Sequence, residues 1–243
     1  MSTILYGCES WLDADLRPVV KLYNWAIKLL LDVRKTTCND ICHLELGLPP
    51  LPNLVRSRQK KFFSGMWRER SLMEDDPLVL TVKTVLGARY NTRNYVHSLI
   101  HASVDDVGES LENLKHSVRN SNSSRRLTYK EINPDLSVHN VYIEKHNIPE
   151  HQRKSFTRFR LSAHSLAVEV GRWNRRGRGR LPVEERLCSC GEIQTENHVV
   201  RDCPLTLNIR LNHNIINMSN IFSNERAIAD QCRIVYLLLS AYN

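Results

Sequence analysis

The sequence predicts a mainly α-helical protein, and three features support this class. Apolar residues recur at intervals of three and four in several long stretches, as they do along one face of an α-helix. Alternating patterns typical of β-strands are scarce. Hydrophobic residues make up 42% of the 243 residues, enough for a packed core, and the nine Gly and nine Pro exclude a collagen-like or low-complexity chain.

Three helices are predicted in the first part of the chain. The first extends over residues 16–33, with Pro18 in its first turn, where proline is tolerated. The second covers residues 41–46 and stops at Gly47, before the Pro49-Pro50 pair. The third, over residues 53–70, mixes apolar residues with six basic ones, which predicts a solvated face over a core stripe, with nucleic-acid contact as the alternative.

Further helices are predicted over residues 98–118 and 156–170 and at the C-terminus. In the last helix one face carries Ile228, Cys232, Val235, Tyr236 and Leu239, and Asn224 is the expected cap. The polar run over residues 120–124 is typical of a linker. We therefore expect a helical region over residues 1–118, a linker over 119–125, a basic helical connector over 126–186 and a small C-terminal module over 187–243.

The net charge of +8 is unevenly distributed. Residues 153–186 contain ten basic and three acidic side chains, whereas the rest of the chain is close to neutral. A single basic segment of this kind indicates a polyanionic partner. The longest apolar run near the C-terminus, Ile234–Leu239, is far shorter than the roughly 20 residues of a membrane span, and no secretion signal is evident. We expect an intracellular chain that does not bind membranes.

Three of the seven cysteines are clustered around a histidine. Cys188 and Cys190 are one residue apart, His198 follows after seven residues, and Cys203 follows after four more. Three thiolates and one imidazole supply the four ligands that zinc requires for tetrahedral coordination. Since four protein ligands leave no open position, the predicted Zn²⁺ is structural and not catalytic. The alternative is a set of buried free thiols beside a surface histidine.

An arginine-rich stretch precedes this cluster. Guanidinium groups match phosphate oxygens, glycine allows close approach of the backbone, and tryptophan can stack on a base. The stretch therefore predicts binding of RNA or single-stranded DNA; a solvated loop is the alternative. Five to eight phosphate contacts would give a slope of log K against log salt of about −3.5 to −5.6. The predicted contacts are Arg172, Trp173, Arg175, Arg176, Arg178 and Arg180.

Other chemistry-bearing groups do not assemble into an active site. Asp75-Asp76 and Asp105-Asp106 lack the flanking strands that would hold two catalytic metal ions, so we interpret both pairs as solvated turn or helix-start residues. Cys38, Cys42 and His43 have no fourth ligand nearby, so core or incidental packing is expected for them. No phosphate-binding Gly-Lys-Ser/Thr loop, serine elbow or Cys/His nucleophile pair is evident.

Two motifs resemble parts of one protein family. The segment Ile4-Leu5-Tyr6-Gly7-Cys8-Glu9-Ser10-Trp11 resembles the end of the palm in reverse transcriptases of non-LTR (LINE-like) retrotransposons. The next helices, with Leu46-Gly47-Leu48-Pro49-Pro50-Leu51, resemble the thumb of those enzymes. The run from Cys188 through Thr195-Glu196-x-His198 to Cys203-Pro204 resembles their C-terminal zinc knuckle.

The resemblance implies a C-terminal part of an RNA-directed DNA polymerase. In that family the catalytic carboxylates would lie before residue 1, so the resemblance implies nucleic-acid binding without polymerisation by this chain. It also implies a nuclear location. Two other interpretations remain: a helical protein-interaction module held together by zinc, whose arginines contact an acidic protein or act as a nuclear address, and an expressed relic without function.

Overall fold

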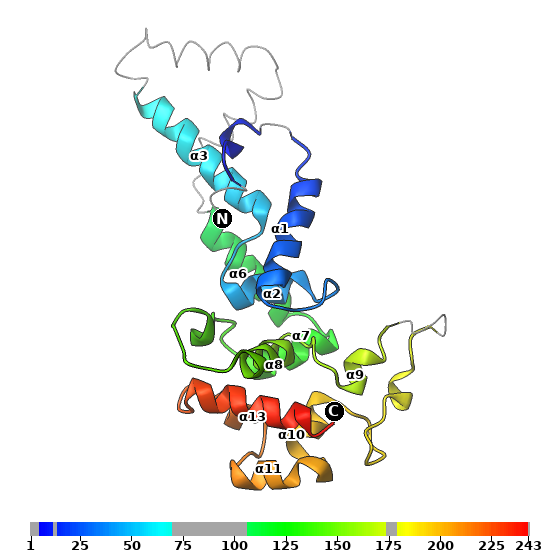
Figure 1. Ribbon diagram of the computed structural model, residues 1–243. Coiled ribbons are helices and arrows are strands. Elements are labelled where there is room, and N and C mark those ends of the chain that lie inside the picture. Colours follow the sequence, from blue (N-terminus) through cyan, green and yellow to red (C-terminus); the bar gives the residue numbers. More distant parts are fainter. Residues whose placement is uncertain (1–4, 12–13, 70–105, 174–178, 243) are drawn as a thin grey trace. The chain divides into compact units, whose positions relative to one another are not determined.

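The computed structural model describes residues 5–11, 14–69, 106–173 and 179–242, and these residues form a mainly α-helical protein (Figure 1). They contain eleven α-helices and four short 3₁₀ helices, which confirms the predicted fold class. Within these residues the single isolated β-bridge pairs Leu187 with Ile193 in antiparallel orientation.

The helical elements have the following bounds. The α-helices are α1 (Arg17–Leu30), α2 (Asn39–Leu46), α3 (Leu51–Glu69), α6 (Asp106–Arg119), α7 (Ser124–Ile132), α8 (Glu150–Arg160), α9 (Ala167–Val170), α10 (Glu196–Arg201), α11 (Leu207–Asn212), α12 (Met218–Phe222) and α13 (Ile228–Ser240). The 3₁₀ helices are η1 (Cys8–Ser10), η2 (Asn140–Tyr142), η3 (Val183–Glu185) and η4 (Pro204–Thr206).

The chain divides into two compact units. Unit 1 comprises Met1–Asn24 and Leu48–Leu114, and unit 2 comprises Trp25–Gly47 and Lys115–Asn243. Residues 126–186 and 187–243, expected from the sequence as two parts, both contribute to one hydrophobic core. Of the expected linker over residues 119–125, only residues 120–123 lie between α6 and α7.

Unit 1 is organised around the contact between η1 and α3. The Gln59 side chain donates to the Cys8 carbonyl at 3.1 Å, and Arg58 donates to the Leu5 carbonyl at 3.3 Å. Gly7 enters η1 with a φ of 68°, a conformation that favours glycine. These hydrogen bonds from α3 therefore hold the backbone at Leu5 and Cys8, within the first of the two motifs noted in the sequence.

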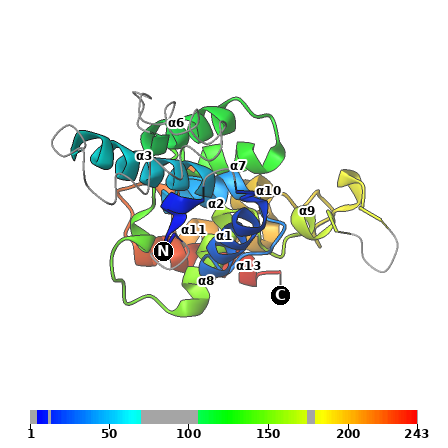
Figure 2. The ribbon, with the colours of Figure 1, turned by 90° about the horizontal axis from the view of Figure 1, so that it is seen from above.

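Unit 2 is built around the pair α8 and α13. Figure 1 shows α13 between α8 and α11, and Figure 2 shows the same unit from above. The buried core includes Phe156 and Phe159 of α8 and Cys232 and Val235 of α13. Of the apolar face predicted for the last helix, Cys232, Val235 and Leu239 are buried, whereas Ile228 and Tyr236 are half-buried.

Two helix boundaries were predicted wrongly. The helix expected over residues 156–170 is interrupted, because α8 ends at Arg160 and Ser162 adopts a φ of 48° before α9 begins. Asn224 does not cap the last helix, whose N-cap is Ala227. The Gln231 amide instead organises the preceding turn, donating to the carbonyls of Ser223 (3.0 Å) and Arg226 (2.9 Å).

The end of α2 is as predicted. Gly47 has a φ of 62°, and its N–H bonds to the carbonyls of the last helical turn. A Cβ at this position would lie 2.6 Å from the side chain of Val138, so both backbone conformation and packing require glycine.

Candidate metal centre and its surroundings

The four clustered residues converge on one point in unit 2. The ligand atoms of Cys188, Cys190, His198 and Cys203 all lie within 4.8 Å of one another, so the cluster could hold a metal ion. The Sγ atom of Cys203 is 3.7 Å from that of Cys188 and 3.9 Å from that of Cys190. Metal–sulfur bonds of about 2.3 Å at tetrahedral angles would place two sulfurs about 3.8 Å apart, so these distances fit one shared tetrahedral ion.

The first two sulfurs are presented by a tight turn. The Cys188 N–H donates to the Glu192 carbonyl at 2.7 Å, and the Gly191 N–H donates back to the Cys188 carbonyl at 2.9 Å. Gly191 has a φ of 97°, which a side chain would disfavour. The Leu187–Ile193 bridge closes the base of this turn. Both thiols of the Cys-x-Cys pair are thus brought to the same side of the loop.

The other two ligands are positioned by α10. The Thr195 side chain caps this helix by accepting a hydrogen bond from the His198 N–H at 3.0 Å. The chain then turns back, and the Cys203 N–H donates to the His198 carbonyl at 2.8 Å. The imidazole Nε2 lies 3.2 Å from the Cys190 sulfur. The spacing of four residues between His198 and Cys203 therefore spans one short helix and its C-terminal turn.

The glutamate of the Thr195-Glu196-x-His198 motif anchors α10 to the segment after α8. His164 Nε2 lies 3.0 Å from a Glu196 carboxylate oxygen, and Ser162 donates to the same oxygen at 3.3 Å. Burial alone would raise the pKa of Glu196, but hydrogen bonding and charge interaction with His164 outweigh it and lower that pKa. His164 and Ser162 could not be singled out from the sequence, because they lie more than 30 residues before their partner.

Burial also affects the cluster itself. It raises the pKa of the Cys188 thiol to about 11. A bound cation would displace this proton and stabilise the thiolate, so metal binding and deprotonation are linked.

The predicted nucleic-acid contacts separate into two groups. Arg172, Trp173 and Arg180 are described by the structure, whereas Arg175, Arg176 and Arg178 lie outside the described residues. Arg172 forms an ion pair with the buried Glu169 at 2.7 Å and donates to the Ser124 hydroxyl at 2.6 Å.

A further arginine, which the sequence did not single out, joins these residues. Arg125 donates to Glu169 at 2.5 Å and lies 5.7 Å from the centre of the Trp173 ring. The indole Nε1 of Trp173 is buried, with no hydrogen-bond acceptor among the described residues. One face of the indole is therefore covered by a cation, and its N–H is left unpaired.

Arg186 connects this region to the metal cluster. It is 2% exposed and donates to the carbonyls of Val168 (3.0 Å) and Leu181 (2.6 Å). A Cβ on Gly171 would lie 2.7 Å from the Arg186 side chain. Gly171 in the arginine-rich stretch is therefore needed for packing as well as for any approach to phosphate.

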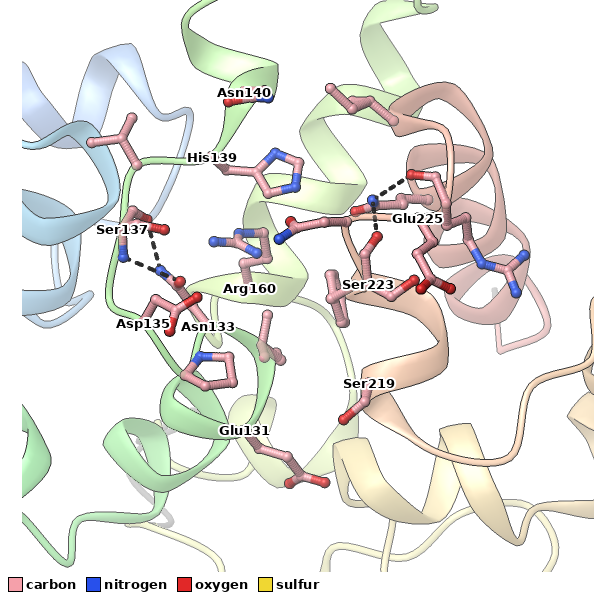
Figure 3. A pocket seen from close by; sticks show the side chains of 18 of the residues that line it. Glu131, Asn133, Asp135, Ser137, His139, Asn140, Arg160, Ser219, Ser223 and Glu225 are labelled. Atoms are coloured by element: carbon pink, nitrogen blue, oxygen red, sulfur yellow. Dashed lines mark hydrogen bonds between the residues drawn. The ribbon is translucent and has the colours of Figure 1, made fainter.

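Unit 2 also contains a cavity of about 740 Å³ between α7, α8, α12 and α13 (Figure 3). Its lining includes three acids, Glu131, Asp135 and Glu225, together with Arg160 and His139. Burial, followed by the charge of Arg160, lowers the pKa of His139 to about 4. His139 Nδ1 accepts from the Val141 N–H at 3.2 Å, so the neutral ring has no free basic nitrogen. This cavity therefore lacks a histidine base.

The remaining sequence candidates behave as follows. Cys42 and His43 are buried in the core, whereas Cys38 is half-buried, and burial raises the pKa of Cys42 to about 12. In the part of the chain that the structure describes, the cluster at 188–203 is the single group of metal-ligating side chains. Asp106 begins α6, whereas Asp75, Asp76 and Asp105 lie outside the described residues.

No described helix has the length and apolar character needed to cross a membrane. No protein-family model, curated protein or solved structure matches this chain. The class of the molecule is therefore defined by its own features: a mainly α-helical protein with a Cys₃His cluster that could bind a metal ion.

Proposed function

We propose that this chain is a zinc-containing, nucleic-acid-binding C-terminal part of a reverse transcriptase of the non-LTR retrotransposon type. The observation that carries the proposal is the convergence of Cys188, Cys190, His198 and Cys203 at distances suited to one tetrahedral ion. The family assignment depends on the sequence resemblance stated above, and polymerisation is not attributed to this chain.

Zinc is favoured by the chemistry of the donor set. Thiolate and imidazole ligands in tetrahedral geometry suit Zn²⁺, whereas Mg²⁺ and Ca²⁺ require oxygen ligands. Four protein ligands leave no position for a reacting water, so the ion would stabilise the loop over residues 186–203. Its role would be to fix the position of the neighbouring basic surface.

RNA or single-stranded DNA is favoured by the residues beside the metal cluster. Trp173 supplies an aromatic ring, and the five arginines of residues 172–180 supply charge. Arg186 joins this region to the metal loop through its hydrogen bonds to Val168 and Leu181. A nuclear location would follow from the same proposal.

Metal content and RNA binding test the proposal together. We expect about one zinc per chain by mass spectrometry, lost in Cys190→Ser and His198→Ala and kept in the control variants Cys38→Ser and His116→Ala, which lie outside the cluster. Binding of a fluorescent single-stranded RNA should weaken with salt at a slope of about −3.5 to −5.6 and should resist competition by heparin. Absence of zinc under reducing conditions, or binding that heparin abolishes, would contradict the proposal.

A protein-interaction module is the second candidate, and one observation favours it. Four apolar side chains after Cys203 are solvent-exposed, including Leu211 (65%) and Ile216 (74%). Exposed apolar residues that gather in one region indicate a docking surface. A chain that holds zinc but binds no RNA would support this candidate.

A further inference from the structure

We infer that Trp173 forms, with Arg34 and Lys35, a pocket that binds one phosphate of a single-stranded nucleic acid. This inference rests on the proposed function and names the part of the surface that would hold the ligand. The five described residues that line the pocket are Arg34, Lys35, Thr36, Val170 and Trp173. They come from two segments more than 130 residues apart, and both segments belong to unit 2.

The size and charge of the pocket define the class of ligand. Its volume of about 480 Å³ lies within the usual range of about 300–1,000 Å³ for sites that hold small molecules. Both charged residues in its described lining are cations. The larger cavity of Figure 3 has three acids and two arginines, Arg160 and Arg226, in its lining, so an anion would favour the pocket at Trp173.

The unpaired indole N–H supplies the most specific evidence. Trp173 Nε1 is buried and has no hydrogen-bond acceptor among the described residues. Buried donors are nearly always paired, because losing hydration without a partner is unfavourable. Because Nε1 is covered in this structure, a ligand oxygen would satisfy this donor after a small shift of the surrounding side chains, and a phosphate presents such oxygens beside the two cations.

The surroundings hold the pocket in place. Arg34 donates to the His164 carbonyl at 3.1 Å, which uses one of the five N–H donors of its guanidinium group. Arg125 donates to the Thr36 carbonyl at 3.5 Å and to Glu169 at 2.5 Å, and it covers one face of the Trp173 ring. A base cannot stack on that covered face, whereas the N–H edge of the indole is unpaired.

A nucleic acid fits this chemistry better than an acidic protein does. A phosphodiester carries its charge on a strand that continues toward other cations, and Arg180 lies seven residues after Trp173. A single carboxylate of an acidic protein could also accept from the indole N–H, but it would not make use of further cations such as Arg180. An acidic peptide is therefore the competing ligand in the test.

Two kinds of variant separate the roles of charge and hydrogen bond. Trp173→Phe keeps an aromatic ring but removes an unpaired buried donor, so we expect thermal stability to be unchanged or raised while affinity for a uridine decamer falls about tenfold. The double variant Arg34→Gln/Lys35→Gln should reduce the steepness of the salt slope by about 0.7, since loss of one single-strand phosphate contact contributes about that much. The control, Lys145→Gln/Arg233→Gln, makes the same charge change at exposed positions outside the pocket.

The test uses the full chain with ¹⁵N-labelled tryptophan, and Trp173→Phe assigns the indole signal. Addition of the uridine decamer should move the Trp173 N–H resonance, and a glutamate decapeptide should not. If the decamer binds but leaves this resonance and both pocket variants at wild-type behaviour, the pocket assignment is wrong and the proposed function stands. If the decamer does not bind at all, the proposed function fails, and the pocket assignment fails with it. A shift caused by the glutamate peptide alone would assign the pocket to an acidic protein and overturn the inference.

Discussion

Glu45 and Arg160 form the most deeply buried ion pair among the described residues of unit 2, and Glu45→Gln tests its contribution to stability. Glu45 is 0% exposed and Arg160 is 2% exposed. The guanidinium donates to the carboxylate at 2.5 Å and 3.0 Å, and the Tyr129 hydroxyl donates at 2.8 Å. Arg160 also lies 5.5 Å from the centre of the Phe156 ring, so the cation is enclosed by apolar groups.

The expected destabilisation follows from the burial of the cation. Glutamine removes the negative charge and turns an NH₂ group toward the N–H donors of Arg160, which leaves a buried cation without its counter-ion. Breaking a buried pair in this way costs about 3–5 kcal/mol. For a urea m-value of about 2 kcal/mol/M, the unfolding midpoint should fall by about 1.5–2.5 M.

The same helix offers a matched control. Asp40 of α2 pairs with Arg126, and its side chain is 29% exposed. Asp40→Asn makes the same acid-to-amide change, but a partly exposed pair is worth only about 0–1 kcal/mol.

Hydrogen exchange of α2 and α8 peptides during urea unfolding of the metal-loaded chain would report on unit 2 directly. A Glu45→Gln midpoint no lower than that of Asp40→Asn would refute the reasoning. The double variant Glu45→Leu/Arg160→Met should recover most of the lost stability, because it leaves no unpaired charge in the core.

Three further predictions concern pH, metal affinity and packing. Burial raises the pKa of Glu45, but the charge of Arg160 outweighs this effect and lowers that pKa below 4.5. The difference in unfolding free energy between wild type and Glu45→Gln should therefore have its full size above pH 4.5 and should narrow as the pH falls through the folded-state pKa. Urea titrations at a series of pH values would measure this difference. Glu196→Gln should weaken metal affinity about 10- to 100-fold in a chelator competition, whereas Glu192→Gln, at an exposed position, should match wild type. Gly171→Ala should lower stability by about 1–3 kcal/mol in thermal unfolding, because its Cβ would lie 2.7 Å from the Arg186 side chain and force that buried side chain to move.

The metal cluster could be predicted because its four ligands are close together in the sequence. Its four ligands lie within 16 residues of sequence, and a tight turn and one capped helix are enough to bring them together. Thr195 and Gly191 serve this local geometry and are visible in the motif. The end of α2 at Gly47 is predictable for the same reason, since a left-handed glycine terminates the helix.

The failures of sequence analysis arise from contacts between distant segments. The helix expected over residues 156–170 is interrupted at Ser162, whose hydroxyl bonds to Glu196, 34 residues away. No periodicity of apolar residues encodes that contact. The partners of Trp173 were missed in the same way, because Arg34 and Arg125 reach it only after unit 2 has folded.

The charge of the basic stretch illustrates how the fold changes a conclusion drawn from composition. Residues 153–186 have a net charge of +7 in the sequence. Within the described structure, three acids from outside the stretch pair with its members. Glu45 pairs with Arg160, Asp32 pairs with Arg158 at 3.0 Å and with Lys154 at 3.5 Å, and Glu150 pairs with Lys154 at 2.7 Å. The surplus is therefore smaller than the sequence implies, while the pocket at Trp173 gains two cations, Arg34 and Lys35, from elsewhere in the chain. The salt dependence of RNA binding should accordingly respond to Arg34 and Lys35, and it should not respond to Arg160, although Arg160 lies within the basic stretch.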